Sequence, residues 1–291
     1  MGAVAVGRVA IAAAAAGLLL LGAACGERSE PTGATAPLYP VTVVGAGDRT
    51  VTAPAPFRRL AVFALGPEEI LRELGAGGWI VAAAPESGTI PLPGLRQARP
   101  DLLIAAETTD ELGLDRASKA TNAPIYVAPG DSIHDVERAV TQLGLLVDAP
   151  VAARRVVHRI EATRSLVEQR VAKLPVVTVF VDTGFFTTVS DQSLTGDLLQ
   201  RARGRNIAGP SPDTGPFDLA RLSQLDPDVI LLTSDSKTSL ADLRSNPRTR
   251  RLTAVRTGRV VAIAATLLDP GPRVGEALLD LARLLHPDAF R

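Results

Sequence analysis

The sequence has few of the residues on which metal and catalytic sites depend. Among 291 residues there are one cysteine, three histidines and 3% aromatic residues. The single cysteine, Cys25, excludes an internal disulfide. The histidines, His134, His158 and His286, share no ligand spacing with one another or with Cys25, so we expect neither a zinc site nor another metal cofactor.

Charge and missing motifs exclude further classes of protein. The 31 basic residues balance 31 acidic ones, so no overall field attracts nucleic acid. The motifs G-x-S-x-G, G-x-x-x-x-G-K and H-E-x-x-H are absent, which removes the common hydrolase and nucleotide-binding templates. We therefore expect neither catalysis nor a cofactor.

The first 25 residues are typical of an export signal. Arg8 supplies a positive charge, and the apolar run over 9–24 is short for a membrane span of about 20 residues. Cys25 follows small residues, so residues 1–25 resemble a lipoprotein signal with a lipid on Cys25; secretory cleavage without a lipid is the alternative. Residues 26–37, rich in Ser, Thr, Pro and Gly, predict a flexible tether. The protein is expected outside the cytoplasmic membrane, anchored to its outer face.

A long helix is predicted over Val151–Leu174. The stretch lacks Gly and Pro, while Pro150 stands just before it and Pro175 just after it. Its apolar residues recur at spacings of three, four and seven and form one stripe: Val156, Ile160, Val167, Val171 and Leu174.

Strands and helices alternate on both sides of this helix. Short apolar runs predict buried strands, and the same motif occurs on each side, as ARPDLLIA at 98–105 and as LDPDVILL at 225–232. We predict an α/β protein with two Rossmann-like lobes, each built on a mainly parallel sheet. The lobes are expected over 38–148 and 175–291, with a single rigid helix over 149–174 and a ligand cleft between them.

Ligands of open α/β sheets bind beyond the carboxyl ends of the strands. The residues expected to contact a ligand there are Leu65, Glu86, Glu107, Phe185, Phe186, Phe217 and Asp235. Because Phe185 and Phe186 directly follow a strand, one ring should point away from the core and stack on a ligand; the alternative is that a loop buries both rings. The three carboxylates are either ligand contacts or helix caps.

Several blocks of the sequence together resemble the periplasmic substrate-binding proteins of ABC importers for cobalamin, haem and ferric siderophores. Besides the two PD motifs, they are the hairpin VTVVGAGDRTVT, FRRLAVFALGPEEILRELGAGGWIVA, LTGDLLQRARGRNIAG and PGPRVGEALLDLARLLHP. The resemblance runs from about Leu38 to the C-terminus. It implies a monomer that captures a bulky metal chelate, namely a ferric siderophore, haem or cobalamin, and delivers it to an ABC permease. Arg273 is the one basic residue expected near the rim of the cleft.

One departure from the family affects docking on a permease. Members of the family carry a Glu on each lobe, seven residues before the Pro of the PD motif, whereas this chain has Pro93 and Ala220 at those positions. Asp218 lies close enough to substitute on one side. The alternative function is therefore a degenerate binding-protein fold that serves as a cell-envelope scaffold or regulatory partner without transport.

Overall fold

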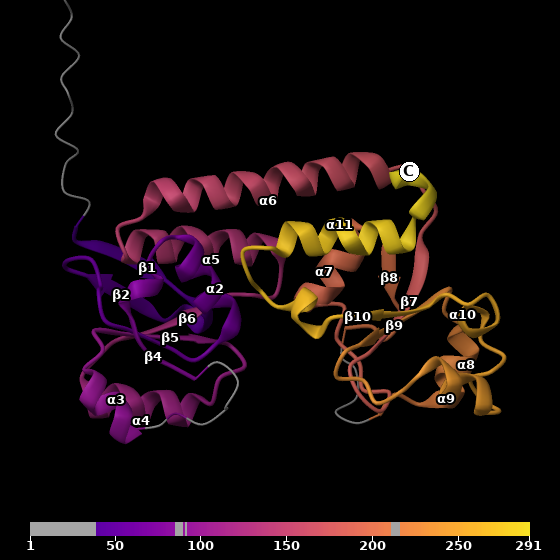
Figure 1. Cartoon of the computed structure of the whole chain (residues 1–291), viewed down its shortest axis with the longest axis horizontal. Coiled ribbons are helices and arrows are strands. Elements are labelled where there is room, and N and C mark those ends of the chain that lie inside the picture. The colour runs from indigo at the N-terminus through magenta and orange to yellow at the C-terminus, as the bar shows by residue number, and fades with distance from the viewer. Residues whose placement is uncertain (1–38, 85–89, 91, 211–215) are drawn as a thin grey trace, which may run out of the picture. The chain divides into compact units, whose positions relative to one another are not determined.

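Two parallel sheets of four strands each form the centres of the two halves of the protein (Figure 1). The computed structural model describes residues 39–84, 90, 92–210 and 216–291. The first sheet has the order β4-β3-β5-β6 and consists of β3 (Leu60–Val62), β4 (Ile80–Ala83), β5 (Leu102–Ala106) and β6 (Ile125–Ala128). The second has the order β10-β9-β7-β8 and consists of β7 (Val177–Asp182), β8 (Gly204–Asn206), β9 (Val229–Thr233) and β10 (Val260–Ile263). All pairings within these sheets are parallel, so the predicted α/β fold class is confirmed.

An antiparallel hairpin precedes the first sheet. Strand β1 (Val41–Val44) pairs with β2 (Thr50–Ala53), and the 3-10 turn η1 (Ala46–Asp48) joins them. Gly47 in this turn has a φ of 63°, a backbone conformation that glycine adopts without strain. The hairpin packs against α5 and β6 and so extends the core of the first half.

The inner strands of the two sheets, β3, β5, β7 and β9, are buried on both faces, which explains their continuous apolar sequences. In β3, Leu60 and Val62 belong to the core on the side of α5, whereas Ala61 belongs to a second cluster on the opposite face. Strand β7 divides in the same way, because Val179 and Phe180 belong to different clusters. Helices therefore cover both faces of each sheet.

The helices of the first half are α2 (Leu65–Glu73), η2 (Gly77–Trp79), α3 (Leu92–Ala98), α4 (Glu111–Thr121) and α5 (Ile133–Leu146). Those of the second half are α7 (Leu194–Arg201), α8 (Leu219–Leu225), α9 (Leu240–Ser245), α10 (Thr253–Arg256), η3 (Ala265–Leu268), α11 (Val274–Leu285) and η4 (Pro287–Phe290). Figure 1 shows α3 and α4 on one side of the first sheet, with α5 on the other.

Helix α6 (Pro150–Val171) joins the halves and has 22 residues, a length of roughly 33 Å. Pro150 occupies its first turn, and four residues of the predicted stripe are buried along it, Val156, Ile160, Val167 and Val171. The helix ends three residues earlier than predicted, so Leu174 lies beyond it. Helices α5 and α11 both pack along it (Figure 1). The contacts are close: a Cβ on Gly144 of α5 would collide with Cβ of Ala153, and one on Gly275 of α11 would lie 3.3 Å from Cα of Ile160.

One hydrophobic cluster runs through both halves along α6. It contains residues of β3, β5 and β6 from the first sheet, residues of β7 and β9 from the second, and the buried faces of α5, α6, α7 and α11. In agreement, Tyr39–Arg291 forms one compact unit. The lobe limits at 148 and 175 stay a prediction.

The predicted signal over 1–25 with Cys25, the tether over 26–37 and the candidate Glu86 lie outside the described residues. Of the helices that the structure describes, none combines the length and the apolar character needed to cross a bilayer.

Candidate functional site

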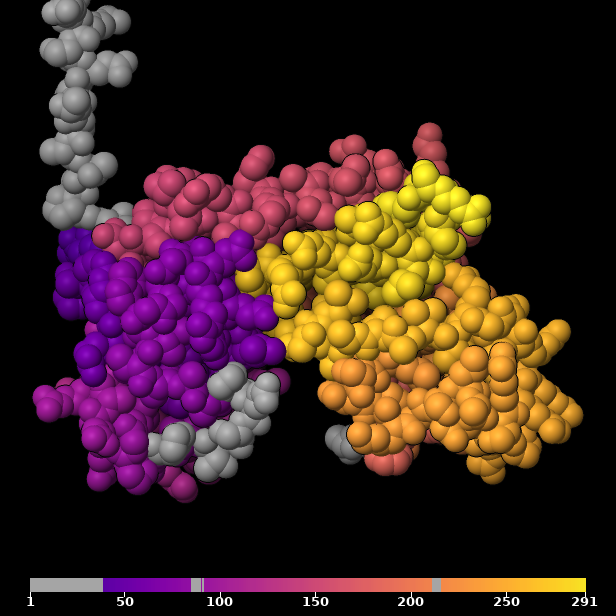
Figure 2. Space-filling model, in the orientation of Figure 1, coloured from indigo at the N-terminus to yellow at the C-terminus, as the bar shows by residue number. Residues whose placement is uncertain are grey.

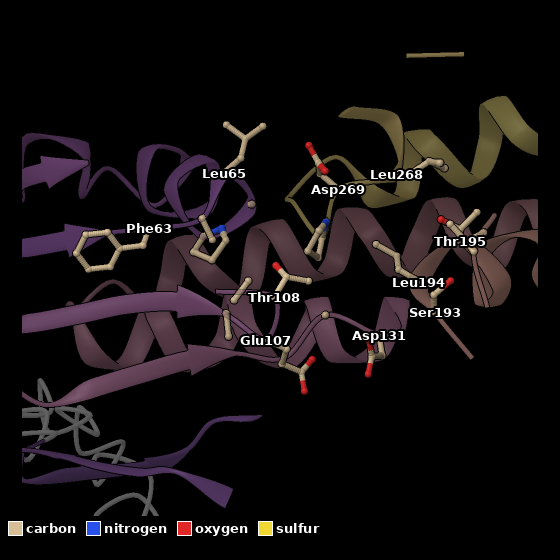
Figure 3. Close-up of a pocket in the computed structure, with 18 residues that line it drawn as sticks. Phe63, Leu65, Glu107, Thr108, Asp131, Ser193, Leu194, Thr195, Leu268 and Asp269 are labelled. Atoms are coloured by element: carbon tan, nitrogen blue, oxygen red, sulfur yellow. The ribbon is translucent and has the colours of Figure 1, made fainter. Parts of the chain in front are cut away.

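A cavity of about 370 Å³, here called the central cavity, lies between the two halves (Figure 3). Figure 2 shows the molecule hollowed between the first half and the second. Loops at the carboxyl ends of β3, β5 and β6 line the cavity from one side, and the start of α7 and the segment after η3 line it from the other. This is the position at which open α/β sheets bind ligands.

The walls of the central cavity combine apolar surface with carboxylates and hydroxyls. The apolar and backbone contributions come from Phe63, Ala64, Leu65, Gly66, Pro67, Ala106, Ala128, Gly130, Val189, Leu194, Leu268 and Pro270. The polar side chains are Glu107, Thr108, Asp131, Ser193, Thr195 and Asp269. Such a mixture of apolar walls and a few polar groups is typical of small-molecule sites.

Two carboxyl groups of the cavity have raised pKa values. Partial burial, followed by the nearby Asp131, raises the pKa of Glu107 above its ordinary value. Burial likewise raises the pKa of Asp269, and the negative charges of Glu69 and Asp235 add to the effect. Among the described residues that line the central cavity, three carry carboxyl groups, namely Glu107, Asp131 and Asp269, and none carries a basic group.

Glycines of the first half allow the second half to approach closely at the cavity. A Cβ on Gly66, in the first turn of α2, would collide with the carbonyl oxygen of Pro270, and one on Gly130 would lie 2.9 Å from Cβ of Pro270. These contacts hold the loop before α11 against α2 and so shape one wall of the cavity.

A polar network also crosses between the halves. The backbone N–H of Ile133, at the start of α5, donates to Oδ2 of Asp197 on α7 at 2.9 Å. Arg201 donates from Nε to the same oxygen at 2.9 Å and from Nη1 to Glu168 of α6 at 2.6 Å. Because charge-assisted bonds have narrow geometry, the network fixes how α5 meets α7 beside the cavity.

The structure brings two of the predicted ligand contacts into the central cavity, Leu65 and Glu107. Glu107 is not a helix cap, because Asp110 caps α4, and Asp235 is not one either, because Ser239 caps α9. Asp235 is exposed and lies outside the cavity lining.

The three predicted aromatic contacts lie apart from the central cavity. Phe185 is 68% exposed, while Phe186 packs against the core of the second half. Phe217 is 4% exposed and its ring centroid lies 5.4 Å from that of Phe180, so the structure places it in the core rather than at the ligand site. Sequence reasoning missed this pairing because Phe217 lies in a loop whose path the sequence does not disclose.

Arg273 is exposed and donates from Nη2 to Glu69 at 3.2 Å, which links the two halves. It lines a smaller cavity of about 200 Å³ beside the central one, together with Asp269. Sequence reasoning missed Asp131, Thr195 and Asp269 as cavity residues. Following β6 to its carboxyl end would have found Asp131, as it found Glu107 after β5.

A buried carboxylate holds the turn that presents Phe185. Asp182 is 1% exposed, and its Oδ1 accepts hydrogen bonds from the N–H groups of Gly184 and Phe186, both at 2.9 Å. Its Oδ2 accepts from the hydroxyl of Ser236 at 3.0 Å. Within the turn, Phe185 and Phe186 have φ values of 49° and 64°, which are strained for residues other than glycine.

A family model described as periplasmic binding protein matches residues 80–267. Comparison with the curated proteins gives no match.

Solved structures share the fold at low sequence identity. Helicobacter pylori CeuE with Ni(II) bound aligns with a TM-score of 0.73 and 15% identity, over 86% of this chain and 90% of that one. The periplasmic heme-binding protein RhuT from a Roseiflexus species gives 0.67 and 19%, over 80% and 99%. A structure of the ABC-type Fe3+-hydroxamate transport system from Saccharomonospora viridis gives 0.67 and 18%, over 84% and 99%.

Proposed function

Since the chain belongs to the periplasmic binding protein family, we propose that it is the solute-binding receptor of an ABC importer. The observation that carries the proposal is the central cavity, which residues from both halves line at the carboxyl ends of their strands. The receptor captures its ligand by binding alone, without covalent chemistry. Closure is small, because α6 and the shared core resist bending between the halves.

The proposed cargo is a metal chelate, a ferric siderophore, haem or cobalamin, or a related organic molecule. The similar structures support this class, because they include CeuE with Ni(II) bound, a heme-binding protein and a protein of an Fe3+-hydroxamate transport system. The central cavity, at about 370 Å³, lies near the lower end of the range of roughly 300–1,000 Å³ for ligand sites. A bulky chelate therefore occupies the cavity with one part and the open hollow of Figure 2 with the rest.

Thermal unfolding with cobalamin, haem and ferric hydroxamates tests the receptor function. A true ligand at 100 times its Kd stabilises the fold by about 2.7 kcal/mol, which raises Tm by about 5–10 °C. No shift of Tm with any of these compounds would contradict the proposal.

The variant Phe185→Ala tests whether the exposed ring of Phe185 stacks on the ligand. Loss of the stacking contact should weaken binding about two- to tenfold. Leu225→Ala, which removes another exposed apolar side chain of the second half, is the matched control and should leave affinity unchanged.

The docking surface favours one second candidate, an envelope scaffold. Position 93, on α3, is a proline, and Ala220, on α8, is exposed, so neither position carries the docking carboxylate of the family. Asp218 is exposed beside Ala220, but its Oδ1 accepts from the N–H of Ala220 at 2.8 Å and caps α8. Affinity purification from membranes separates the candidates: a co-purifying permease supports the receptor, and cell-wall enzymes without a permease support the scaffold.

We also propose that the protein is exported and held at the outer face of the membrane by a lipid on Cys25, since the signal over 1–25 ends in a lipobox-like sequence. Cells grown with alkyne-tagged palmitate should label the protein, and Cys25→Ala should abolish the label completely. Ser29→Ala, four residues further on, is the control that keeps it. Label that persists in the Cys25→Ala variant, or wild-type protein that is exported without label, would favour plain secretory cleavage.

A further inference from the structure

The charged residues around the central cavity are acidic. Glu107 and Asp131 are close neighbours at one edge, and Figure 3 shows Asp269 at the opposite edge. No Lys, Arg or His is among the described residues that line the cavity. The internal segments outside the described residues, 85–89, 91 and 211–215, contain no basic residue in their sequences either.

This negative charge continues into two neighbouring cavities. A cavity of about 380 Å³ shares Glu107 and Asp131 with the central one, and the cavity of about 200 Å³ shares Asp269. The acidic residues that line the three cavities are Asp48, Glu69, Glu107, Asp131, Asp135, Asp269, Glu276 and Asp280. The basic ones are Arg138 and Arg273. A further cavity of about 250 Å³ also shares Glu107, and its one arginine, Arg49, pairs with Glu111 of the same lining at 2.6 Å. Since the whole chain has 31 basic and 31 acidic residues, this imbalance is a local property of the site.

Arg138 and Arg273 each form an ion pair with a carboxylate. Nη2 of Arg138 lies 2.8 Å from Oδ1 of Asp135, and Nη2 of Arg273 lies 3.2 Å from Oε1 of Glu69. Neither arginine lines the central cavity. An anionic ligand would therefore meet three carboxylates and no cationic side chain among the described residues of the cavity wall, and this repulsion would weaken its binding.

The uncharged residues of the lining indicate which kind of chemical group fits the central cavity. Thr195 is 4% exposed and lines the cavity, and its hydroxyl takes part in no hydrogen bond among the described residues, so a ligand N–H can use it as an acceptor. Across the part of the chain that the structure describes, no three His, Cys, Asp or Glu side chains lie close enough to hold a metal ion. Leu65, Leu194 and Leu268 instead offer apolar surface, which suits an organic group rather than a bare metal ion.

We propose that the ligand carries a positively charged organic group, an ammonium or guanidinium, which enters the central cavity between Glu107 and Asp131 on one edge and Asp269 on the other. This inference rests on the proposed receptor function and narrows its cargo to cationic chelates or related organic cations. Burial, and after it the neighbouring carboxylates, raises the pKa values of Glu107 and Asp269, and a bound cation would favour the ionised form of both groups.

A pair of ligands that differ in one charge tests the proposal. Ferrioxamine B carries a terminal ammonium group, and its N-acetyl derivative keeps the same ferric chelate without that charge. Titration calorimetry with the purified full chain should show ferrioxamine B binding at least tenfold more tightly than the derivative. Spermidine, as a compact organic cation, and ferric enterobactin and molybdate, as anions, complete the panel; the anions should bind more weakly than either cation.

Isosteric substitutions test whether the carboxylates of the central cavity bind the positive charge of the ligand. Glu107→Gln and Asp269→Asn should each weaken the binding of ferrioxamine B about tenfold and leave the affinity for the N-acetyl derivative unchanged. The reason is that the loss of a carboxylate charge matters only for the ligand that carries the positive charge. Asp288→Asn, at an exposed carboxylate near the C-terminus, is the control and should change neither affinity. In the absence of ligand, both cavity variants should raise Tm, since they remove a carboxylate whose ionised form the site disfavours.

Four results would overturn the inference. Equal affinities for the charged and acetylated chelates, or tighter binding of either anion, would exclude a cationic ligand and leave the receptor function intact. Binding of Ni²⁺ alone in preference to every organic cation would exclude the organic group. If no member of the panel bound, and no chelate of the earlier series either, the receptor function itself would be contradicted and this inference with it.

Discussion

Replacing Ile160 by Ala is expected to lower the free energy of unfolding by about 3 kcal/mol, within the range of roughly 2–5 kcal/mol for such truncations. Ile160 is 1% exposed in the middle of α6, where Gly275 brings α11 against its Cα. The close contact leaves the backbones little room to collapse, so the removed atoms leave a cavity. Urea denaturation should show a lower midpoint with an unchanged slope.

The matched control for this variant is Leu166→Ala on the same helix. Leu166 is 47% exposed, so its truncation should change stability by no more than about 0.5 kcal/mol. Similar losses at both positions would contradict the one-sided packing of α6. A loss at Ile160 below about 1 kcal/mol would contradict the close contact with α11.

Asp182→Ala is the second substitution for which we expect a large loss, about 3 kcal/mol. The change removes the acceptor of three hydrogen bonds, from Gly184, Phe186 and Ser236, and leaves the two backbone donors without that partner. It also releases a turn in which two neighbouring phenylalanines have positive φ. Phe185 would then lose its fixed place on the surface.

Two comparisons make this prediction specific. Asp182→Asn keeps one acceptor oxygen and should lose roughly half as much stability. Asp191→Ala removes an exposed carboxylate of the same half and should change stability by less than about 0.5 kcal/mol. Chemical denaturation measures all three. Equal stability of Asp182→Ala and wild type would show that the turn does not depend on the carboxylate.

The sequence predicts the long elements of the fold well, because their apolar residues are periodic. The stripe of α6 and the apolar runs of β5 and β9 are examples. Short polar elements gave no such signal: β8 (Gly204–Asn206) has no apolar run, and α8 has one fully buried leucine, Leu222. Helix α4 begins at Glu111, because the side chain of Asp110 accepts hydrogen bonds from the N–H groups of Leu112 and Gly113.

The site could be predicted only where a side chain follows a strand directly. Glu107 satisfies this condition and was predicted, whereas Asp269 lies beyond the turn η3, so its position depends on the path of a loop. The same limit explains Phe217, which entered the core by pairing with Phe180. The negative charge of the cavity also could not be predicted, since it arises when loops from both halves meet.

The hydrophobic cluster that runs along α6 has a consequence for the lifetime of the protein. Because strands of both sheets share it, local unfolding of either half exposes apolar surface of the other. The two halves therefore unfold together, and proteases gain access to both at the same time. A ligand that contacts both halves would therefore protect the whole chain from proteolysis rather than one half of it.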